Sequence, residues 1–308
     1  MEKTDLHLVK FLYELMEISN DSKLGPSITT FIAKTSLDFW SSREEQLKAI
    51  NQLYSDGLNF FYGNTVSQNY EKAFTLFKEG ANHNHVDCIF KLGSCYRLGL
   101  GVEKNLVAAV DYFKKSTEMG NVFGMLNLGY CFIKGAGVDK NVSEAVQWFK
   151  KVADLGNSEG FLGLYFCYSA ELGAEKNVLE ALKHLEVAID MGNTQAMDTM
   201  GCLLWNGDGV EINDNDAFKY FKLSADAGNS GGMMNLGECY IEGCGVPRDV
   251  QKGMKLLQQA ADLNNIRAID RLIDLYKGIN SADSLSYWER KKAESHLDID
   301  LYKRGGLL

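Results

Sequence analysis

Apolar and polar positions recur every 36 residues between residues 49 and 264, without insertion or deletion. Each unit holds an apolar run at helical spacing, a glycine-rich turn, and a second apolar run at helical spacing. A fixed period of roughly 20 to 50 residues is typical of solenoids, in which each unit packs only on its neighbours. The pattern therefore predicts an all-α fold of stacked units, each made of helix A, a turn, helix B and a second turn.

Four positions that recur in the repeat predict where its helices and turns lie. The reference glycine of helix A is Gly129, which corresponds to Gly57, Gly93, Tyr165, Gly201 and Gly237 in the other units. A glycine that favours left-handed backbone follows in the turn, at Gly101, Gly137, Gly173, Gly209 and Gly245. The residue before helix B suits an N-cap, and it is Asn69, Asn105, Asn141, Asn177, Asn213 or Asp249. Helix B is then expected to end at Gly120, Gly156, Gly192 and Gly228.

The core can be anticipated in the same way. In the unit from 86 to 121, we expect helix B to turn Val107, Ala109, Val110 and Phe113 inward. Helices of neighbouring units are expected to come closest at a column of small residues, namely Gly124, Gly160, Ala196, Gly232 and Ala268. A bulky Tyr165 in place of the reference glycine could widen the packing of its unit.

Both ends of the chain depart from the repeat. Residues 1–48 are expected to form an N-terminal helical cap, with one helix over residues 5–18 and another from Ser27 to Ile50 that could break near Ser41 and Ser42. Residues 265–308 are expected to hold a degraded seventh repeat and a last capping helix. Such caps cover the open apolar ends of a solenoid.

Composition narrows the function. A net charge of −9 argues against nucleic acid, which requires a basic surface. We see neither a signal peptide nor an apolar run long enough to span a membrane. Four of the 7 cysteines share one column, where stacking leaves them too far apart for a disulfide. We therefore expect reduced, buried thiols and a cytoplasmic location. Export by a route that needs no N-terminal signal remains an alternative.

The stretch from Leu128 to Val138, followed by Asn141, Ala145 and the pair Trp148-Phe149, resembles the Sel1-like repeat. That family is related to tetratricopeptide repeats, and the resemblance implies a right-handed αα-superhelix. Six units cover residues 49–264. The unit at 158–193 departs from the pattern at Tyr165 and at Glu171, where glycines are expected.

The resemblance also implies a concave face lined by helix A, where tetratricopeptide relatives hold peptides. Asparagine two residues before the reference glycine would bond a peptide backbone, because its amide both donates and accepts. Core packing, or an asparagine bond to a neighbouring helix, is the alternative for these positions. The predicted partner-binding residues are Phe90, Phe123, Leu126, Asn127, Tyr130, Ile133, Phe166, Trp205, Met234 and Asn235.

We therefore predict a non-catalytic scaffold or adaptor that binds a peptide or protein and requires no cofactor. Related proteins act as signalling scaffolds, quality-control adaptors or bacterial effectors. Some cysteine-rich relatives act weakly on β-lactam compounds, so a weak hydrolase is one alternative. A solenoid that assembles with itself is another, although a monomer is our expectation. His83, His85 and Cys88 lack a plausible fourth ligand, so no metal site is expected.

Overall fold

The computed structural model describes residues 26–169, 177–278 and 281–294. The chain divides into two compact units, Met1–Lys104 and Asn105–Leu308, and each is described by itself. The helix expected at residues 5–18 lies outside the described residues, as do Glu171 and Gly173. All regular structure in the described ranges is helical, as predicted.

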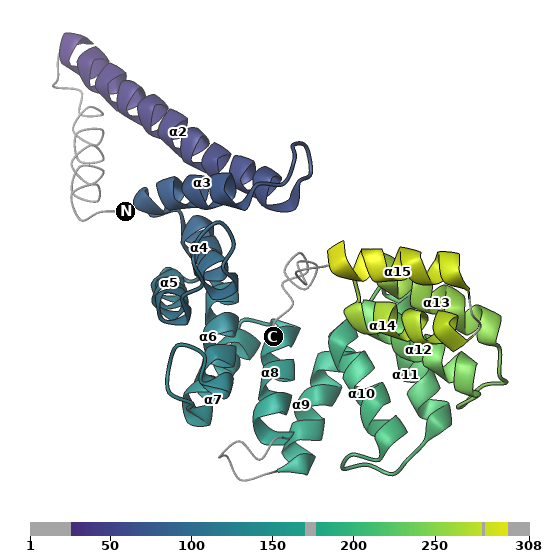
Figure 1. The fold of residues 1–308 in the computed structure, drawn as a ribbon. Coiled ribbons are helices and arrows are strands. Elements are labelled where there is room, and N and C mark those ends of the chain that lie inside the picture. Colours follow the sequence, from purple (N-terminus) through teal and green to yellow (C-terminus); the bar gives the residue numbers. More distant parts are fainter. Residues whose placement is uncertain (1–25, 170–176, 279–280, 295–308) are drawn as a thin grey trace. The chain divides into compact units, whose positions relative to one another are not determined.

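The first unit contains α2 (Pro26–Tyr62), α3 (Tyr70–Asn82) and α4 (Val86–Leu98) (Figure 1). Helix α2 runs without a break through Ser41 and Ser42, so the suggested break there is wrong. This one helix joins the end of the predicted cap to helix A of the first repeat. Helix α3 packs on both α2 and α4.

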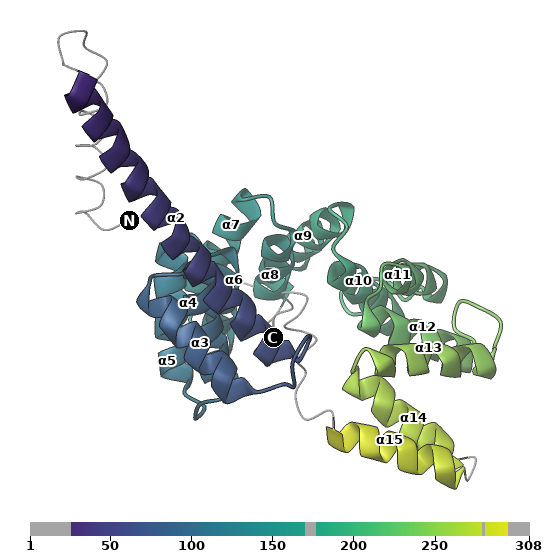
Figure 2. The same ribbon diagram turned by 90° about the horizontal axis from the view of Figure 1, so that it is seen from above.

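The second unit alternates helices A and B along the chain (Figures 1 and 2). Its helices A are α6 (Val122–Lys134), α8 (Ser158–Ser169), α10 (Thr194–Asn206), α12 (Ser230–Glu242) and α14 (Ile266–Gly278). Its helices B are α5 (Leu106–Glu118), α7 (Val142–Asp154), α9 (Val178–Asp190), α11 (Asp214–Asp226) and α13 (Val250–Asp262), and α15 (Ala282–Glu294) follows last. Helices that are consecutive in sequence pack against one another throughout.

The predicted cap of helix B is present in all six units. The side-chain oxygen of Asn105, for example, accepts from the backbone N–H of Ala108 at 3.0 Å. Its counterparts Asn69, Asn141, Asn177, Asn213 and Asp249 make the same bond. The described turn glycines and the glycines that end helix B adopt the left-handed backbone expected of them, and Asn84 and Asn264 take up that conformation in the two units that lack the glycine at the end of helix B.

A second capping column was not predicted. The side chain of Asn121 accepts from the N–H of Gly124 at 2.8 Å and so caps helix A of its unit. Equivalent residues that cap helix A are His85, Asn193 and Asn229. Each of the two helices of a repeat therefore begins at its own capping side chain, and both capping positions recur with the period of the repeat.

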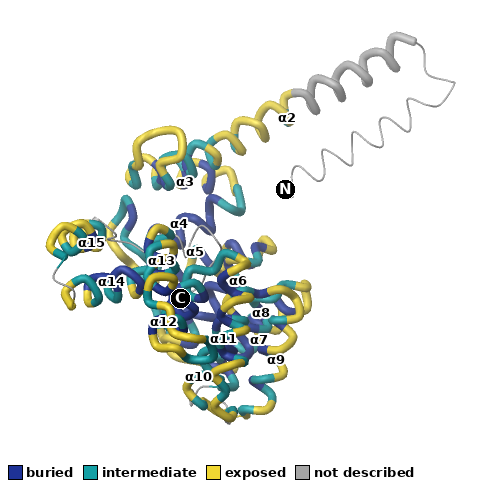
Figure 3. The backbone as a smooth tube through the Cα atoms, turned by 90° about the vertical axis from the view of Figure 1, so that its right-hand side faces the viewer, coloured by how far each residue is buried: buried dark blue, intermediate teal, exposed yellow. Residues whose placement is uncertain are grey.

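A buried phenylalanine on helix B fills the core of most units. Ala109, Val110 and Phe113 are buried as predicted, whereas Val107 is 61% exposed, so that expectation was wrong. Val107 lies about 120° around the helix from Phe113, away from the stripe that faces helix A. In Figure 3, buried residues run along the packed helices of the second unit, and exposed ones lie at its turns and along the outer sides of its helices.

The reference glycine is explained by this aromatic column. A Cβ added at Gly129 would lie 2.8 Å from Cε1 of Phe149, and one at Gly201 would lie 2.5 Å from Cε1 of Phe221. In the unit with Tyr165, the residue equivalent to these phenylalanines is Leu185, and the two pack in one buried cluster. The large residue has moved from helix B to helix A, which offsets the loss of the glycine.

The column of small residues lies at the closest approach between units, as predicted. A Cβ at Gly124 would lie 2.3 Å from Oγ of Ser116, and one at Gly160 would lie 2.4 Å from the backbone nitrogen of Ala153. Helix A of each unit therefore sits tightly on helix B of the unit before it. This tight contact determines how much of helix A remains open to a partner.

Candidate functional site

The candidate site is one stripe of side chains on helices A of the second unit, which we call the helix-A face. It comprises residues six, three and two positions before the reference glycine, and one and four positions after it. These spacings place them on one side of an α-helix. The members used below are Phe123, Asn127, Tyr130, Glu159, Gly163, Phe166, Asp198, Thr199, Cys202, Trp205, Gly231, Asn235, Glu238, Arg267 and Arg271.

Several predicted contact residues are instead core residues. Leu126 has no exposed surface, and Ile133 and Met234 are 9% exposed or less. In the first unit, Phe90 is also buried. These residues fit the alternative of core packing, because helix A is enclosed by helix B of its own unit and that of the unit before. The aromatic patch is therefore smaller than predicted.

Three predicted aromatic residues remain available. Phe123 is 44% exposed, and Phe166 and Trp205 are half-buried. Trp205 packs edge to face on Phe221 with ring centroids 5.5 Å apart, which holds the indole in place. Aromatic side chains that are anchored on one edge and open on the other are typical binding hot spots.

Both predicted asparagines are buried, and their amide nitrogens are engaged within the protein. Nδ2 of Asn127 donates to the carbonyl oxygen of Phe123 at 2.8 Å. Nδ2 of Asn235 donates to Oδ1 of Asp198 at 2.8 Å and to Sγ of Cys202 at 3.5 Å. The alternative of a bond to a neighbouring helix therefore describes Asn235. Neither carbonyl oxygen accepts a hydrogen bond from the described residues, so each keeps only its acceptor for a ligand.

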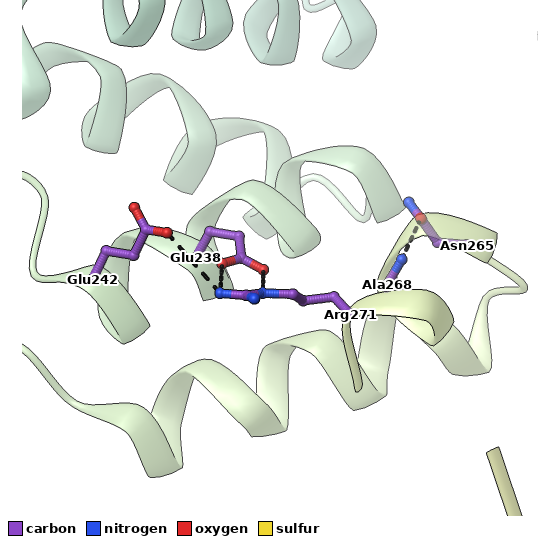
Figure 4. Close-up of polar contacts among 5 residues, drawn as sticks. All are labelled: Glu238, Glu242, Asn265, Ala268 and Arg271. Atoms are coloured by element: carbon purple, nitrogen blue, oxygen red, sulfur yellow. Dashed lines mark hydrogen bonds and ion pairs between the residues drawn. The ribbon is translucent and has the colours of Figure 1, made fainter. Parts of the chain in front are cut away.

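Side chains on the helix-A face bridge one repeat to the next. The residue two before the reference glycine reaches back to the residue one after the glycine in the preceding unit. Asn235 reaches Cys202 in this way. One unit later, Arg271 donates to both carboxylate oxygens of Glu238 at 2.8 and 3.1 Å (Figure 4). The α10–α12 and α12–α14 steps are therefore closed by the chain itself.

The earlier steps of the row lack this bridge. Gly163 stands at the bridging position of α8 and has no side chain, and the ring of Phe149 fills the space beside it. Thr199 stands there on α10, and its hydroxyl donates to the carbonyl oxygen of Gln195 on its own helix. As a result Tyr130, which is only 8% exposed, has no hydrogen bond from its hydroxyl to the described residues.

Two carboxylates lie on the same stripe, and the sequence analysis did not select them. Glu159 accepts from Nδ2 of Asn193 at 3.0 Å, and Asp198 is 5% exposed. Burial raises the pKa of both carboxyl groups, and the hydrogen bonds from Asn193 and Asn235 partly oppose that rise. Their positions in the repeat were the available signal, because both fall on the predicted concave columns.

Little else among the described residues resembles a chemical site. They contain no group of three or more side chains that could hold a metal ion. His85 instead caps α4 and stacks on Tyr54. An open depression of about 620 Å³ lies beside Tyr240 at the turn before α13, away from the helix-A face. No helix in the described ranges is long and apolar enough to cross a membrane.

The seven cysteines are all free, as expected, and five of them are buried. Burial raises the pKa of Cys95, Cys167 and Cys239 to about 12, so these thiols stay protonated at neutral pH. No disulfide therefore joins the two helices of any unit.

The comparisons with known proteins agree with this architecture. The Sel1 repeat profile matches residues 53–85, 86–121, 122–157, 160–193, 194–229 and 230–265. No relative was found among the curated proteins compared.

Several solved structures are similar. A Sel1 repeat protein from Oxalobacter formigenes is 24% identical with a TM-score of 0.60, and the match covers 81% of this chain and 99% of that one. A protective antigen of uropathogenic Escherichia coli with an SLR fold is 26% identical with a TM-score of 0.53, over 86% of this chain and 60% of that one. This chain therefore spans 60% of the E. coli protein's length. The repeat matches cover more than half of the sequence, and the chain belongs to the Sel1 repeat family.

Proposed function

We propose that this chain is a non-catalytic scaffold that holds an extended segment of a protein partner on the helix-A face of its second unit. Sel1 repeat proteins generally act as protein-interaction scaffolds, which supports the class of function. The observation that carries the location is the set of acceptor atoms left open beside Phe123, Phe166 and Trp205. An extended peptide presents backbone N–H groups and side chains that can use both features.

The rigid setting of this face favours binding. The open groups are carried by helices whose other faces are packed in the core, so little side-chain freedom is lost when a partner binds. Asn127 and Asn235 are held by their own amide nitrogens, which fixes the direction of their open carbonyl oxygens. These oxygens suit the N–H groups of a partner backbone. The anchoring energy would come from the aromatic side chains.

The test compares aromatic truncations on two sides of the repeat. Full-length protein is used to capture partners from a cell lysate, followed by mass spectrometry, beside the double variant Phe123→Ala with Trp205→Ala. The control is Leu179→Ala with Leu223→Ala, which removes side chains that are 75% and 52% exposed outside the helix-A face. Circular dichroism confirms that each variant keeps its helices.

We expect a partner that binds the native protein and the control but is lost from the aromatic double variant. Titration calorimetry with the purified partner should then show affinity falling by roughly a thousandfold, since two hot-spot truncations at about 2 kcal/mol each cost about 4 kcal/mol together. Equal recovery by all three proteins would move the binding site away from the helix-A face.

A second candidate function is self-association through the ends of helices B. Met119, Leu155 and Met191 occupy the same position in three successive units, and they are 43%, 61% and 43% exposed. Apolar side chains that recur at one exposed position can form a contact with a second copy. Light scattering over a range of concentrations distinguishes the two functions, because a monomeric scaffold keeps a constant mass whereas an assembling solenoid does not.

A further inference from the structure

Building on the proposed function, we infer that the segment held on the helix-A face is basic. Glu159 on α8 and Asp198 on α10 would each receive a Lys or Arg side chain of the partner. The inference rests on four features of this face, namely the open oxygens of both carboxylates, the missing bridge between repeats beside Glu159, an ion pair further along the row, and the charge of the chain.

Glu159 is held in place by one oxygen and open at the other. Its Oε1 accepts from Asn193, whose own side-chain oxygen caps α10 by accepting from the N–H of Ala196 at 2.8 Å. Its Oε2 makes no hydrogen bond or ion pair with the described residues. A carboxylate fixed in this way offers a second lone-pair site to a donor without having to be reordered.

Asp198 shows the same arrangement in a more enclosed place. Oδ1 accepts from Asn235, while Oδ2 has no hydrogen-bond partner among the described residues. A Cβ at Gly231 would lie 2.8 Å from Oδ2, so the absence of a side chain there keeps this oxygen uncovered. Gly231 is an ordinary helical residue without a left-handed backbone. Arg267 on α14 acts on Asp198 only through its charge, which lowers the pKa of the carboxyl group without forming an ion pair.

Tyr130 adds an independent sign that a ligand belongs here. Its ring packs edge to face on Phe149 with centroids 5.0 Å apart, and its hydroxyl lies close enough to Glu159 to be affected by that charge. The hydroxyl makes no hydrogen bond with the described residues. Buried polar side chains normally find a partner. In this step of the row, Gly163 supplies none.

An ion pair within the protein shows which kind of side chain would bind Glu159 and Asp198. Between α12 and α14, the guanidinium of Arg271 binds both oxygens of Glu238 and approaches Glu242 at 4.0 Å (Figure 4). No described cation makes such a pair with Glu159 or Asp198. A partner arginine or lysine at Glu159 or at Asp198 would make the contact that Arg271 makes with Glu238.

The surroundings also suit a basic segment. Phe166 and Trp205 lie on the same stripe, and aromatic faces bind the stems and charged heads of Lys and Arg. The net charge of −9 draws a basic segment toward the protein and disfavours an acidic one.

The experiment uses four pools of fluorescein-labelled nonapeptides, with random flanking residues and a fixed central Arg, Lys, Gln or Glu. Binding to the full-length protein is measured by fluorescence polarisation at low salt. The variants are Glu159→Gln and Asp198→Asn, which keep shape and remove charge. The matched control is Glu186→Gln, which removes an exposed carboxylate on α9. Thermal melting checks the folding of each protein.

We expect the Arg and Lys pools to bind at least about tenfold more tightly than the Gln pool, because hydrogen bonds between charged groups are stronger than those between neutral ones. Glu159→Gln and Asp198→Asn should each remove most of that preference, whereas Glu186→Gln should leave it. Both variants should melt no earlier than the native protein, because burial of these carboxylates does not favour the charged form.

Two results would overturn the inference. If the Gln or Glu pool binds as tightly as the Arg pool, the face binds peptides without a preference for basic ones, and the proposed function stands alone. The same holds if a charge preference survives in both Glu159→Gln and Asp198→Asn. If no pool binds, the proposed peptide-binding function fails together with the inference.

Discussion

Exchanging the two large residues of one repeat gives the most direct test of the packing argument. Most units pair a glycine on helix A with a phenylalanine on helix B, as in Gly129 with Phe149. One unit pairs Tyr165 with Leu185 instead. If the aromatic ring has moved from one helix to the other, then Tyr165→Gly and Leu185→Phe should each destabilise the protein alone. The double variant should be destabilised by less than the sum of the two single variants.

The magnitudes follow from burial. Tyr165 is 6% exposed and Leu185 is 0% exposed, so neither site has room to spare. Truncating a buried aromatic side chain costs about 3–5 kcal/mol, and glycine inside a helix adds about 1 kcal/mol. Enlarging Leu185 beside the intact tyrosine costs about 1–3 kcal/mol by overpacking. In the double variant, the new phenylalanine enters the space that Tyr165 left, and we expect a favourable coupling of about 2 kcal/mol.

The assay is urea unfolding of the four proteins of this cycle, followed by circular dichroism and compared as midpoints at constant slope. The mirror exchange serves as a control, because Phe221→Leu should partly rescue Gly201→Tyr. A double variant whose destabilisation equals the sum of its single variants, within about 0.5 kcal/mol, would show that the two residues do not share one space. The account of this repeat would then be refuted.

Three further predictions concern caps, turns and thiols. Asn141→Ala should cost about 1 kcal/mol in thermal unfolding by removing the cap of α7, and Asn141→Asp should cost much less because aspartate caps the equivalent helix α13. Gly137→Ala should destabilise the protein far more than Gly156→Ala. Both glycines have left-handed backbone, with φ of 76° and 74°, but only the Cβ added at Gly137 would meet another atom, the carbonyl oxygen of Leu106 at 2.2 Å. Equal effects of the two substitutions in urea unfolding would contradict this reasoning. The half-buried Cys244 should react first with iodoacetamide at pH 8. Burial raises the pKa of Cys95, Cys167 and Cys239 to about 12 and keeps these thiols protonated, so their labelling should require unfolding.

The repeat architecture could be predicted because its causes are local. A capping side chain, a left-handed glycine and an inward stripe each depend on a few neighbouring residues, and the period shows them six times over. Asn121 and its equivalents could have been identified as helix-A caps by the same argument, since they recur as regularly as Asn105. The continuity of α2 was harder to foresee, because two serines weaken a helix without ending it.

The binding face was predicted less well, because exposure depends on how closely helices approach. Positions taken from tetratricopeptide relatives assume that helix A presents a whole side to the groove. In this chain, Gly124 and Gly129 allow both neighbouring helices B to approach, which encloses Leu126 and leaves Phe123 open. The reach of Asn235 to Asp198 also depends on the spacing between repeats, which no single unit encodes.

The helices A therefore differ in the residue at the bridging position, two residues before the reference glycine. Where it carries Arg271, the chain satisfies its own carboxylate and leaves little for a partner to replace. Where it carries Gly163, a phenol and a carboxylate oxygen remain open on rigid helices. A solenoid binds by adding a chain along its repeats, and the added chain gains most where the repeats have not bonded to each other. The departures from the repeat pattern, rather than the repeats themselves, are thus the part of this sequence that can specify a partner.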